Sequence, residues 1–501
     1  MEIINYSRPQ INKKSLTLRF VFYFLPYTSP KRVKRIKPVK LIKLFSMSQP
    51  NLLKDSIPSL LWKIGLPAGI GFFFNTLFNI TDAFWAGKLG VEASTAMSQT
   101  FPIFLLLIVF GNGLSGAAST LIGNALWAKN EKQVATIIEH IFFLSIILVI
   151  ILTPSLLAFT PTLLRLTGDP THLVQSLSLD YIVPILSFAL IFLFSYTLNG
   201  ILNAYGDTKT YSRALIVGAI VNVGMNPLLM YGFGFPGMGI AGVAWATIII
   251  QLVTLMYMIS VIHRRGILAH CHWNNWKPQW RVIRDIFHIA IPASLSMIFV
   301  AVGIFIINAF LKDFGTAVMA VYGVGTRIEQ IVLLPTIGLS IAASAIIAQN
   351  NGAKNFARVR ETYHLSLLYG TFVIIPLAIA IWFLSDRLYP LFVTGKNPAD
   401  VAEILRLGRE YTTVIIGLFW GYIFLFITIW ALQSVRRPMF GLWMGLFRQV
   451  VLPLIVFTLV VRAGGDYLDI WWSIFGIVWV SAIIAIVYGR RVFKNLESKE
   501  K

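Results

Sequence analysis

Apolar stretches, each long enough for a membrane-spanning helix, follow one another from residue 62 to residue 489 and are separated by short polar breaks. A helix needs about 20 apolar residues to cross a bilayer. Backbone groups in lipid must be hydrogen-bonded within their own segment, so such stretches predict helices. We count twelve spans, which predicts an all-α integral membrane protein.

The composition agrees with this pattern, because 57% of the residues are hydrophobic, 13% are charged and the mean hydropathy is +0.74. A soluble core could not bury so much apolar surface. The single cysteine, Cys271, excludes an internal disulfide, and no Cys/His cluster has zinc-ligand spacing. We therefore expect no cofactor or metal chemistry apart from a coupling ion.

The net charge of +21 is distributed by loop, which argues for membrane topology and against nucleic-acid binding. Loops rich in Lys and Arg alternate with basic-poor ones. The basic loops are residues 127–133, 204–213, 263–285, 350–361 and 434–438. Positive loops mark the cytoplasmic side. This predicts a multi-pass protein of the inner (plasma) membrane with both termini in the cytoplasm.

A repeat appears when the sequence is shifted by 225 residues. Matching pairs are Pro67 and Pro292, Gly90 and Gly315, residues 113–115 and 338–340 (GLS), 117–119 and 342–344 (AAS), and 128–130 and 353–355 (AKN). Several matches at one spacing indicate two homologous lobes of six helices each. Repeats with an even number of spans are related by an axis along the membrane normal, as in transporters whose lobes alternate around a central site.

The repeat divides the chain into five parts. We expect a first lobe at residues 62–264 with helices 1–6, a cytoplasmic linker at 265–284 and a second lobe at 285–489 with helices 7–12. Residues 1–61 and 490–501 are interpreted as cytoplasmic tails. A polybasic cluster at residues 31–35 could bind anionic lipid. A disordered tail, or translation starting at Met47, explains residues 1–46 better.

Polar residues on the first span mark a candidate site. Asn75, Asn79 and Asp82 are spaced to share one helical face. A carboxylate inside the bilayer is costly and is by default a functional hypothesis. The repeat places Ile307 opposite Asp82 in the second lobe, and this asymmetry favours a site over a purely structural role.

The fifth span carries Asn222 and Asn226 one turn apart, followed by Pro227, whose ring frees a backbone carbonyl. Amide and carbonyl oxygens suit a small cation. On the sixth span Thr247 and Gln251 are again one turn apart. Gln251 and Asn75 are tentative substrate ligands.

Glu329, on the eighth span, is a third tentative substrate ligand. It lies two residues from Arg327, so the two side chains do not face each other on a helix. A salt bridge to another helix, or a position near the membrane surface, explains Glu329 better than substrate binding.

The sequence resembles the multidrug and toxic compound extrusion (MATE) transporters from about Asn51 onward. The similarity is carried by residues 79–90 (NITDAFWAGKLG), 198–209 (LNGILNAYGDTK), 222–227 (NVGMNP), 237–247 (GMGIAGVAWAT) and 348–355 (AQNNGAKN). The resemblance implies a twelve-helix antiporter that exports organic, often cationic or aromatic, compounds in exchange for protons or sodium.

The resemblance also implies roles for single residues. Asp82 matches the cation-responsive aspartate of the family, with Asn222, Asn226 and Thr247 as its partners and Asn79 beside it. Many relatives carry a second Asp where this chain has Asn226, so a proton is favoured over sodium. Sodium held by Asp82, Asn222 and Asn226 stays the alternative ion.

We therefore expect an antiporter that works by rocker-switch alternating access, as a monomer, on small organic substrates among membrane lipids. A flippase for a lipid-linked or amphipathic substrate is the alternative, because it shares this architecture. A membrane-embedded enzyme is not favoured, since no catalytic set of His, Cys or carboxylates is found within the spans. A passive channel or scaffold would not need an ion gradient.

Overall fold

The computed structural model describes residues 50–127, 130–167, 172–234, 236–271, 277–392 and 398–497, and every regular element in these ranges is helical. Residues 49–501 form one compact unit, which is the part considered below. The tail predicted at residues 1–61 lies mostly outside the described residues, as do residues 272–276 of the linker and 498–501 of the second tail.

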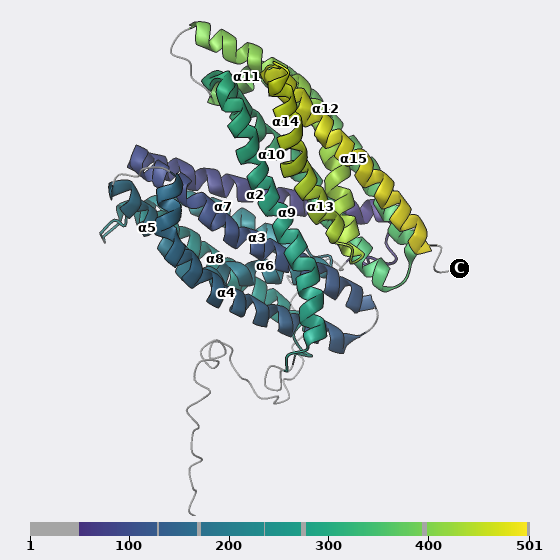
Figure 1. The fold of residues 1–501 in the computed structure, drawn as a ribbon. Coiled ribbons are helices and arrows are strands. Elements are labelled where there is room, and N and C mark those ends of the chain that lie inside the picture. The colour runs from purple at the N-terminus through teal and green to yellow at the C-terminus, as the bar shows by residue number, and fades with distance from the viewer. Residues whose placement is uncertain are drawn as a thin grey trace, which may run out of the picture. The chain divides into compact units, whose positions relative to one another are not determined.

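The helices follow one another with short connections (Figure 1). They are α2 (Ile57–Leu89), α3 (Val91–Trp127), α4 (Glu131–Thr167), α5 (His172–Ser187), α6 (Ala189–Ala204), α7 (Lys209–Tyr231), α8 (Ile240–Arg264), α9 (Trp280–Leu311), η4 (Lys312–Phe314), α10 (Thr316–Gly352), α11 (Phe356–Phe392), α12 (Pro398–Ser434), α13 (Met439–Leu446), η5 (Phe447–Val451), α14 (Leu452–Arg462) and α15 (Tyr467–Glu497).

Eleven spans in the described ranges are long and apolar enough to cross a membrane, and the pair α5 and α6 supplies a twelfth if it is one bent span. These two helices meet at an angle of 52°. Pro184 lies in the last turn of α5, and a proline removes one helical hydrogen bond, which explains the bend. The all-α membrane fold is thus confirmed, and its fourth span is broken.

Two hydrophobic cores correspond to the two halves of the chain. One gathers buried residues of α3–α8 and the other gathers those of α10–α15. The first turns of α2 belong to the second core, through Leu60 and Ile64. The first turns of α9 belong to the first core, through Ile286 and Ile289. The beginning of the first helix of each half therefore packs in the hydrophobic core of the other half.

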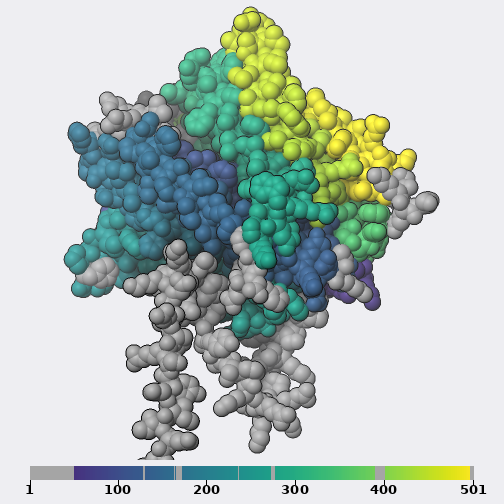
Figure 2. All heavy atoms as spheres, turned by 60° about the horizontal axis from the view of Figure 1, so that its bottom comes forward, coloured from purple at the N-terminus to yellow at the C-terminus, as the bar shows by residue number. Residues whose placement is uncertain are grey.

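Small residues make this exchange possible, and their contacts repeat at the spacing of 225. On α10, a side chain at Gly338 would strike the backbone of Gly65 and Gly69 on α2. On α3, a side chain at Gly113 would strike Ala290 and Ser294 on α9. Adding 225 to 65, 69 and 113 gives 290, 294 and 338, so the two contacts are equivalent. In Figure 2 the teal-green residues of α9 lie against the blue residues of the first half.

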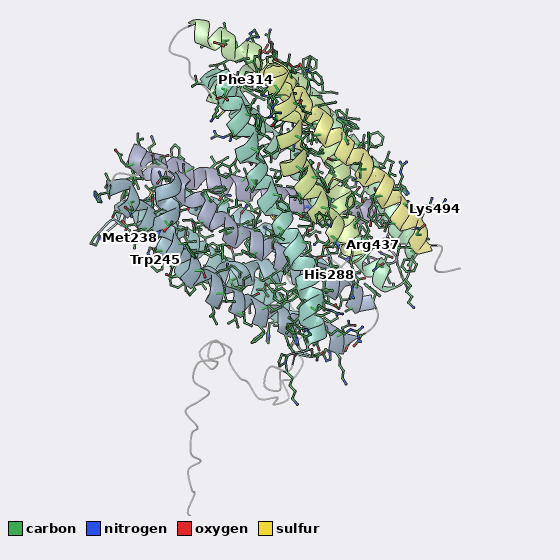
Figure 3. All side chains as sticks on the ribbon, viewed as in Figure 1. Met238, Trp245, His288, Phe314, Arg437 and Lys494 are labelled. Carbon is green, nitrogen blue, oxygen red and sulfur yellow. The ribbon has the colours of Figure 1, made fainter. Side chains whose placement is uncertain are left out.

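Helix α9 runs past this contact from His288, near its beginning, to Phe314, just beyond its end (Figure 3).

The helix ends that carry the basic loops are joined by polar contacts between the halves. Asn124 Nδ2 donates to the carbonyl of Ser434 over 3.0 Å, and Gln349 Nε2 donates to the carbonyl of Ala204 over 2.5 Å. We call this set of residues the amide latch.

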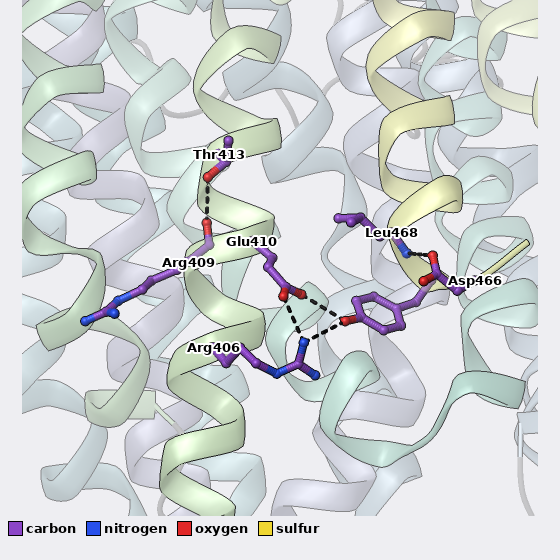
Figure 4. A network of polar contacts seen from close by, with 7 residues as sticks. Arg406, Arg409, Glu410, Thr413, Asp466 and Leu468 are labelled. Carbon is purple, nitrogen blue, oxygen red and sulfur yellow. Dashed lines mark hydrogen bonds and ion pairs between the residues drawn. The ribbon is translucent and has the colours of Figure 1, made fainter.

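At the opposite helix ends, a smaller polar network connects α12 with the start of α15 (Figure 4). Arg406 Nη1 lies 2.8 Å from Glu410 Oε1, and the Tyr467 hydroxyl donates to Glu410 Oε2 over 2.9 Å. Asp466 accepts a hydrogen bond from the backbone N–H of Leu468. Arg406 is exposed and Glu410 and Tyr467 are half-buried, and ion pairs open to solvent contribute little to stability.

Candidate functional site

Asp82 lies at the centre of a closed polar cluster inside the first half. Its Oδ1 accepts hydrogen bonds from Asn222 Nδ2 over 2.9 Å and from Asn226 Nδ2 over 2.8 Å. Its Oδ2 accepts one from the Thr247 hydroxyl over 3.2 Å. The Asp82 side chain is 3% exposed and both asparagines are fully buried. Three helices, α2, α7 and α8, thus converge on one carboxylate.

The local sequence explains why these side chains meet. Asn222 and Asn226 are one helical turn apart on α7, so both amides point to the same side. Asn226 Nδ2 also lies 3.1 Å from Asn222 Oδ1, which ties the two amides together. Thr247 additionally donates to the carbonyl of Val243 on its own helix. The cluster is therefore held from both α7 and α8.

The charge of the Asp82 carboxylate is balanced only by neutral donors. None of the ion pairs found in the described part of the chain involves Asp82. A buried charge without a counter-charge is costly, and adding a proton removes that cost. The Asp82 carboxylate is therefore a group whose buried charge a proton would remove.

A sodium ion fits this arrangement less well. Sodium needs oxygen ligands, but Asn222 and Asn226 turn their nitrogen atoms toward the carboxylate. The free oxygen, Asn226 Oδ1, is buried and accepts no hydrogen bond within the described residues. Both amides would have to rotate to present their oxygens. Within the same residues, no group of three or more His, Cys, Asp or Glu side chains could hold a metal ion.

The other residues proposed for the first half do not join the cluster. Asn79 is exposed and its amide donates to the carbonyl of Asn75 on its own helix, over 3.0 Å. Asn75 and Gln251 are half-buried and do not contact Asp82 through a hydrogen bond in the described structure. The common helical face predicted for Asn75, Asn79 and Asp82 thus changes from exposed to buried along α2.

Glu329 lies in a separate cluster in the second half. Its Oε1 accepts a hydrogen bond from the Tyr411 hydroxyl over 3.0 Å. A cavity of about 30 Å³ beside it is also lined by Tyr422, Arg448 and Ile307. The Arg448 guanidinium carbon lies 5.5 Å from the centre of the Tyr422 ring. Glu329 is 9% exposed, so it is buried among second-half helices.

This second cluster occupies the place that the repeat assigns to the Asp82 site. Ile307 corresponds to Asp82 at a spacing of 225, and Pro453 corresponds to Pro227 at a spacing of 226. The second spacing pairs Arg448 with Asn222. Sequence reasoning missed Arg448, although the shared proline could have located it. It lies in a π-helical turn, η5, a conformation that is frequent at functional sites.

A hollow of about 880 Å³ opens between the halves at the helix ends away from the amide latch. Its polar lining comes from the first turns of α3: Ser94, Thr95, Ser98 and Gln99. Phe305 of α9 contributes an apolar wall from the second half. The buried Gln99 Oε1 accepts no hydrogen bond in the described structure. The hollow is large enough for an organic molecule and offers it both polar and apolar contacts.

Comparisons with known proteins match both halves. A sequence model of the MatE family matches residues 67–228 and 292–458. The chain is 31% identical over 338 residues to the probable multidrug resistance protein YoeA of Bacillus subtilis, covering 66% of this chain and 72% of that protein. It is 30% identical over 429 residues to a FAD transporter of Shewanella oneidensis, covering 83% and 90%.

A solved structure shares the fold. It belongs to a MOP superfamily transporter from Pyrococcus furiosus and matches with a TM-score of 0.82 at 22% identity, covering 89% of this chain and 98% of that chain. The two family matches begin 225 residues apart, which is the spacing of the repeat.

Proposed function

Because this chain belongs to the MATE family of membrane transporters, we propose that it is a proton-coupled antiporter that exports organic compounds by alternating access. The observation that carries the proposal is the buried Asp82 carboxylate, which is held only by neutral donors. Uptake of a proton from the outer side would neutralise it and change what Asn222, Asn226 and Thr247 can bond to.

Helix α2 connects this chemistry to the lobe contact. Asp82 lies near one end of α2, while Gly65 and Gly69 near the other end pack on Gly338 of α10. A change in how α2 is held by α7 and α8 therefore acts on the contact that keeps the latch side closed. A proton can drive the cycle only if it binds the two access states with different affinity.

Removing the negative charge of Asp82 tests the proposal of proton-coupled export. Asp82→Asn keeps the size of the side chain, so the protein should fold and insert normally. We expect export under an imposed pH gradient to fall by about tenfold or more, because the two access states no longer differ in proton affinity. Asp180→Asn, which changes an exposed acid on α5, is the matched control. Unimpaired ethidium efflux by Asp82→Asn would contradict the proposal.

The coupling ion is tested separately in reconstituted vesicles. Purified protein is given a pH gradient without sodium, or a sodium gradient at equal pH. We expect the pH gradient alone to drive export, because the amides of Asn222 and Asn226 present nitrogen rather than oxygen to the site. Export driven by a sodium gradient alone would show that the coupling ion is sodium and not the proton.

The substrate class follows from the hollow and from the relatives. Two relatives are named a probable multidrug resistance protein and a FAD transporter, and FAD is an organic compound. The hollow between α3 and Phe305 offers hydroxyl and amide groups beside an aromatic ring. We propose that a single chain takes such compounds from the cytoplasm and that the basic loops face the cytoplasm.

A flippase is the second candidate, and one feature favours it. An apolar groove of about 250 Å³ lies between α2 and α10, with Trp62, Leu66 and Phe73 exposed along it. Exposed apolar side chains of a membrane protein face lipid, so an acyl chain could enter here. Transfer of fluorescent lipid between leaflets, at a rate that matches drug export, would favour the flippase.

A further inference from the structure

One exposed charge lies between the ends of the four helices that form the lobe contact. More than six residues from their ends, α2, α3, α9 and α10 carry only three Asp, Glu, Lys or Arg residues, all within described ranges: Asp82, Arg327 and Glu329. Both acids are buried, whereas Arg327 is exposed. Within the described residues its guanidinium has no hydrogen-bond or ion-pair partner. The accessible charge of this contact region is therefore positive.

The position of Arg327 follows from helix geometry. Gly338 packs on Gly65 and Gly69 of α2, and Arg327 lies eleven residues before it, which is three helical turns on the same face of α10. Eleven residues after Gly65, on the matching face of α2, comes Thr76. Arg327 is exposed at this level, so α2 does not cover its side chain. Arg327 thus lies where α2 and α10 part.

Neither buried acid can neutralise Arg327 in this state. The Asp82 carboxylate is enclosed by Asn222, Asn226 and Thr247. Glu329 bonds to Tyr411 and lies beside the cavity that also contains Arg448. An arginine within a membrane-spanning helix is costly unless it finds a partner, and it is by default a functional hypothesis.

We propose that Arg327 binds the carboxylate or phosphate of an amphipathic organic anion, so that the exported substrates include anions besides the cations that the family resemblance suggests. The inference rests on the proposed transport function. A guanidinium can bind a carboxylate or phosphate through two parallel hydrogen bonds. The apolar part of the molecule would lie in the adjoining groove, whose lining includes Phe73, Ile331 and Leu334.

The groove supports this occupant by its position. Ile331 and Leu334 are one and two turns from Arg327 on α10, and both line the groove. A ligand that reaches both would need a negative group and an apolar body separated by one or two helical turns, roughly 5–10 Å. Anionic lipid shares this chemistry with soluble organic anions, so the experiment must separate the two.

The first arm measures binding, independently of transport. Fluorescein, a carboxylate dye, is titrated by fluorescence polarisation against purified protein in nanodiscs of phosphatidylcholine, with and without phosphatidylglycerol. We expect Arg327→Gln to weaken dye binding about tenfold, Arg327→Lys to restore part of it, and Arg406→Gln on α12 to leave it unchanged. Dye binding that is unaffected by Arg327→Gln overturns the inference. The inference is also overturned if Arg327→Gln weakens dye binding only in the nanodiscs that contain phosphatidylglycerol.

The second arm measures export in phosphatidylcholine vesicles with a pH gradient, using fluorescein and the cation ethidium in parallel. We expect Arg327→Gln to abolish fluorescein export and to spare ethidium. Export of ethidium with no fluorescein export by the native protein overturns the inference and leaves the proposed function standing. If the native protein exports neither compound, although its dye binding still depends on Arg327, the proposed function is overturned instead.

Discussion

Asn226 determines how many negative charges the first-half site contains. Its amide donates to Asp82 and also lies within bonding distance of Asn222, so it serves as a neutral clamp. A carboxylate here would place two acids side by side in a buried site. Two buried negative charges repel each other unless a cation lies between them.

Asn226→Asp should therefore add a response to sodium. Asp82, the new carboxylate and the Thr247 hydroxyl would together offer an oxygen-rich site. We expect a sodium gradient at equal pH to raise export by about fivefold over the native protein, a modest coupling between sites. Vesicle transport measures this, and Asn222→Asp provides a comparison on the same helix. A variant that folds yet ignores sodium would show that the oxygen set is incomplete.

Cys271 allows a test of the linker between the halves. The linker lies outside the spans, and burial, followed by the nearby charge of Glu139, raises the pKa of this thiol to about 12. The thiolate is the reactive form, so the raised pKa lowers reactivity at neutral pH, and reactivity should increase as pH rises.

We expect maleimide to label Cys271 about 1000-fold more slowly at pH 7.5 than an ordinary exposed cysteine, because three pH units of pKa lower the thiolate fraction by that factor, with a rise of about tenfold per pH unit up to pH 11. Lys277→Cys in a Cys271→Ser background supplies the exposed reference, because residue 277 is exposed in the same linker. Equal labelling rates for the two cysteines would show that the packing around residue 271 opens in solution.

Single residues differ in how well sequence foretells their role. Asp82 and Asn222 could be predicted because a carboxylate or paired amides within an apolar span are visible in the sequence itself. Arg448 could be located only through the repeated proline, Pro453, and its relation to Glu329 could not be predicted, since it depends on how α10 and η5 come together around one cavity. Arg327 was visible, but its exposure depends on where α2 and α10 separate, which no local pattern records.

At the scale of elements, the first helix of the first half has two roles. One end of α2 contributes to the Asp82 site and the other packs on α10 through Gly65, Gly69 and Gly338. The sequence predicted the number of spans and the repeat. It did not predict that α5 and α6 form a bent pair, because a proline within a span can either kink or end a helix.

Gly338→Val should separate α2 from α10. Its new side chain would strike the backbone of Gly65 and Gly69, and backbone cannot rotate away. We expect export to fall by about tenfold or more through a shift away from the latch-closed state. Gly323→Val is the matched control, because nothing lies within 4 Å of a side chain added there on the same helix. Equal export by both variants would mean that α2 and α10 tolerate the separation.

At the scale of the whole transporter, the two halves close against each other by equivalent bonds. Asn124 of α3 bonds to the end of α12, and Gln349 of α10 bonds to the end of α6. Asn124 and Gln349 are 225 residues apart, so the repeat places one amide of the latch on each half. Asn124 Oδ1 also accepts a hydrogen bond from Asn351, and Gln349 Oε1 accepts one from Trp127, again between the halves. A closure made of equivalent bonds should open in proportion to how many are lost.

Asn124→Ala and Gln349→Ala test this directly. A buried hydrogen bond contributes about 1 kcal/mol and each variant loses at least one, so each should shift the ratio of closed to open protein at least about fivefold, and the double variant at least about 25-fold if the bonds act independently. Spin labels on Arg264→Cys and Arg437→Cys, one per half in a Cys271→Ser background, report the separation as a distance distribution. Both sites are exposed near the latch.

Asn112→Ala is the control for these variants, because the amide of Asn112 bonds only within its own helix, to the carbonyl of Ile108. If the double variant opens no further than either single one, the two amides act as one unit and breaking either bond already releases the other. If neither distance distribution moves, the glycine contacts of α2 and α9 hold the halves together, and the amides only fill the space between them.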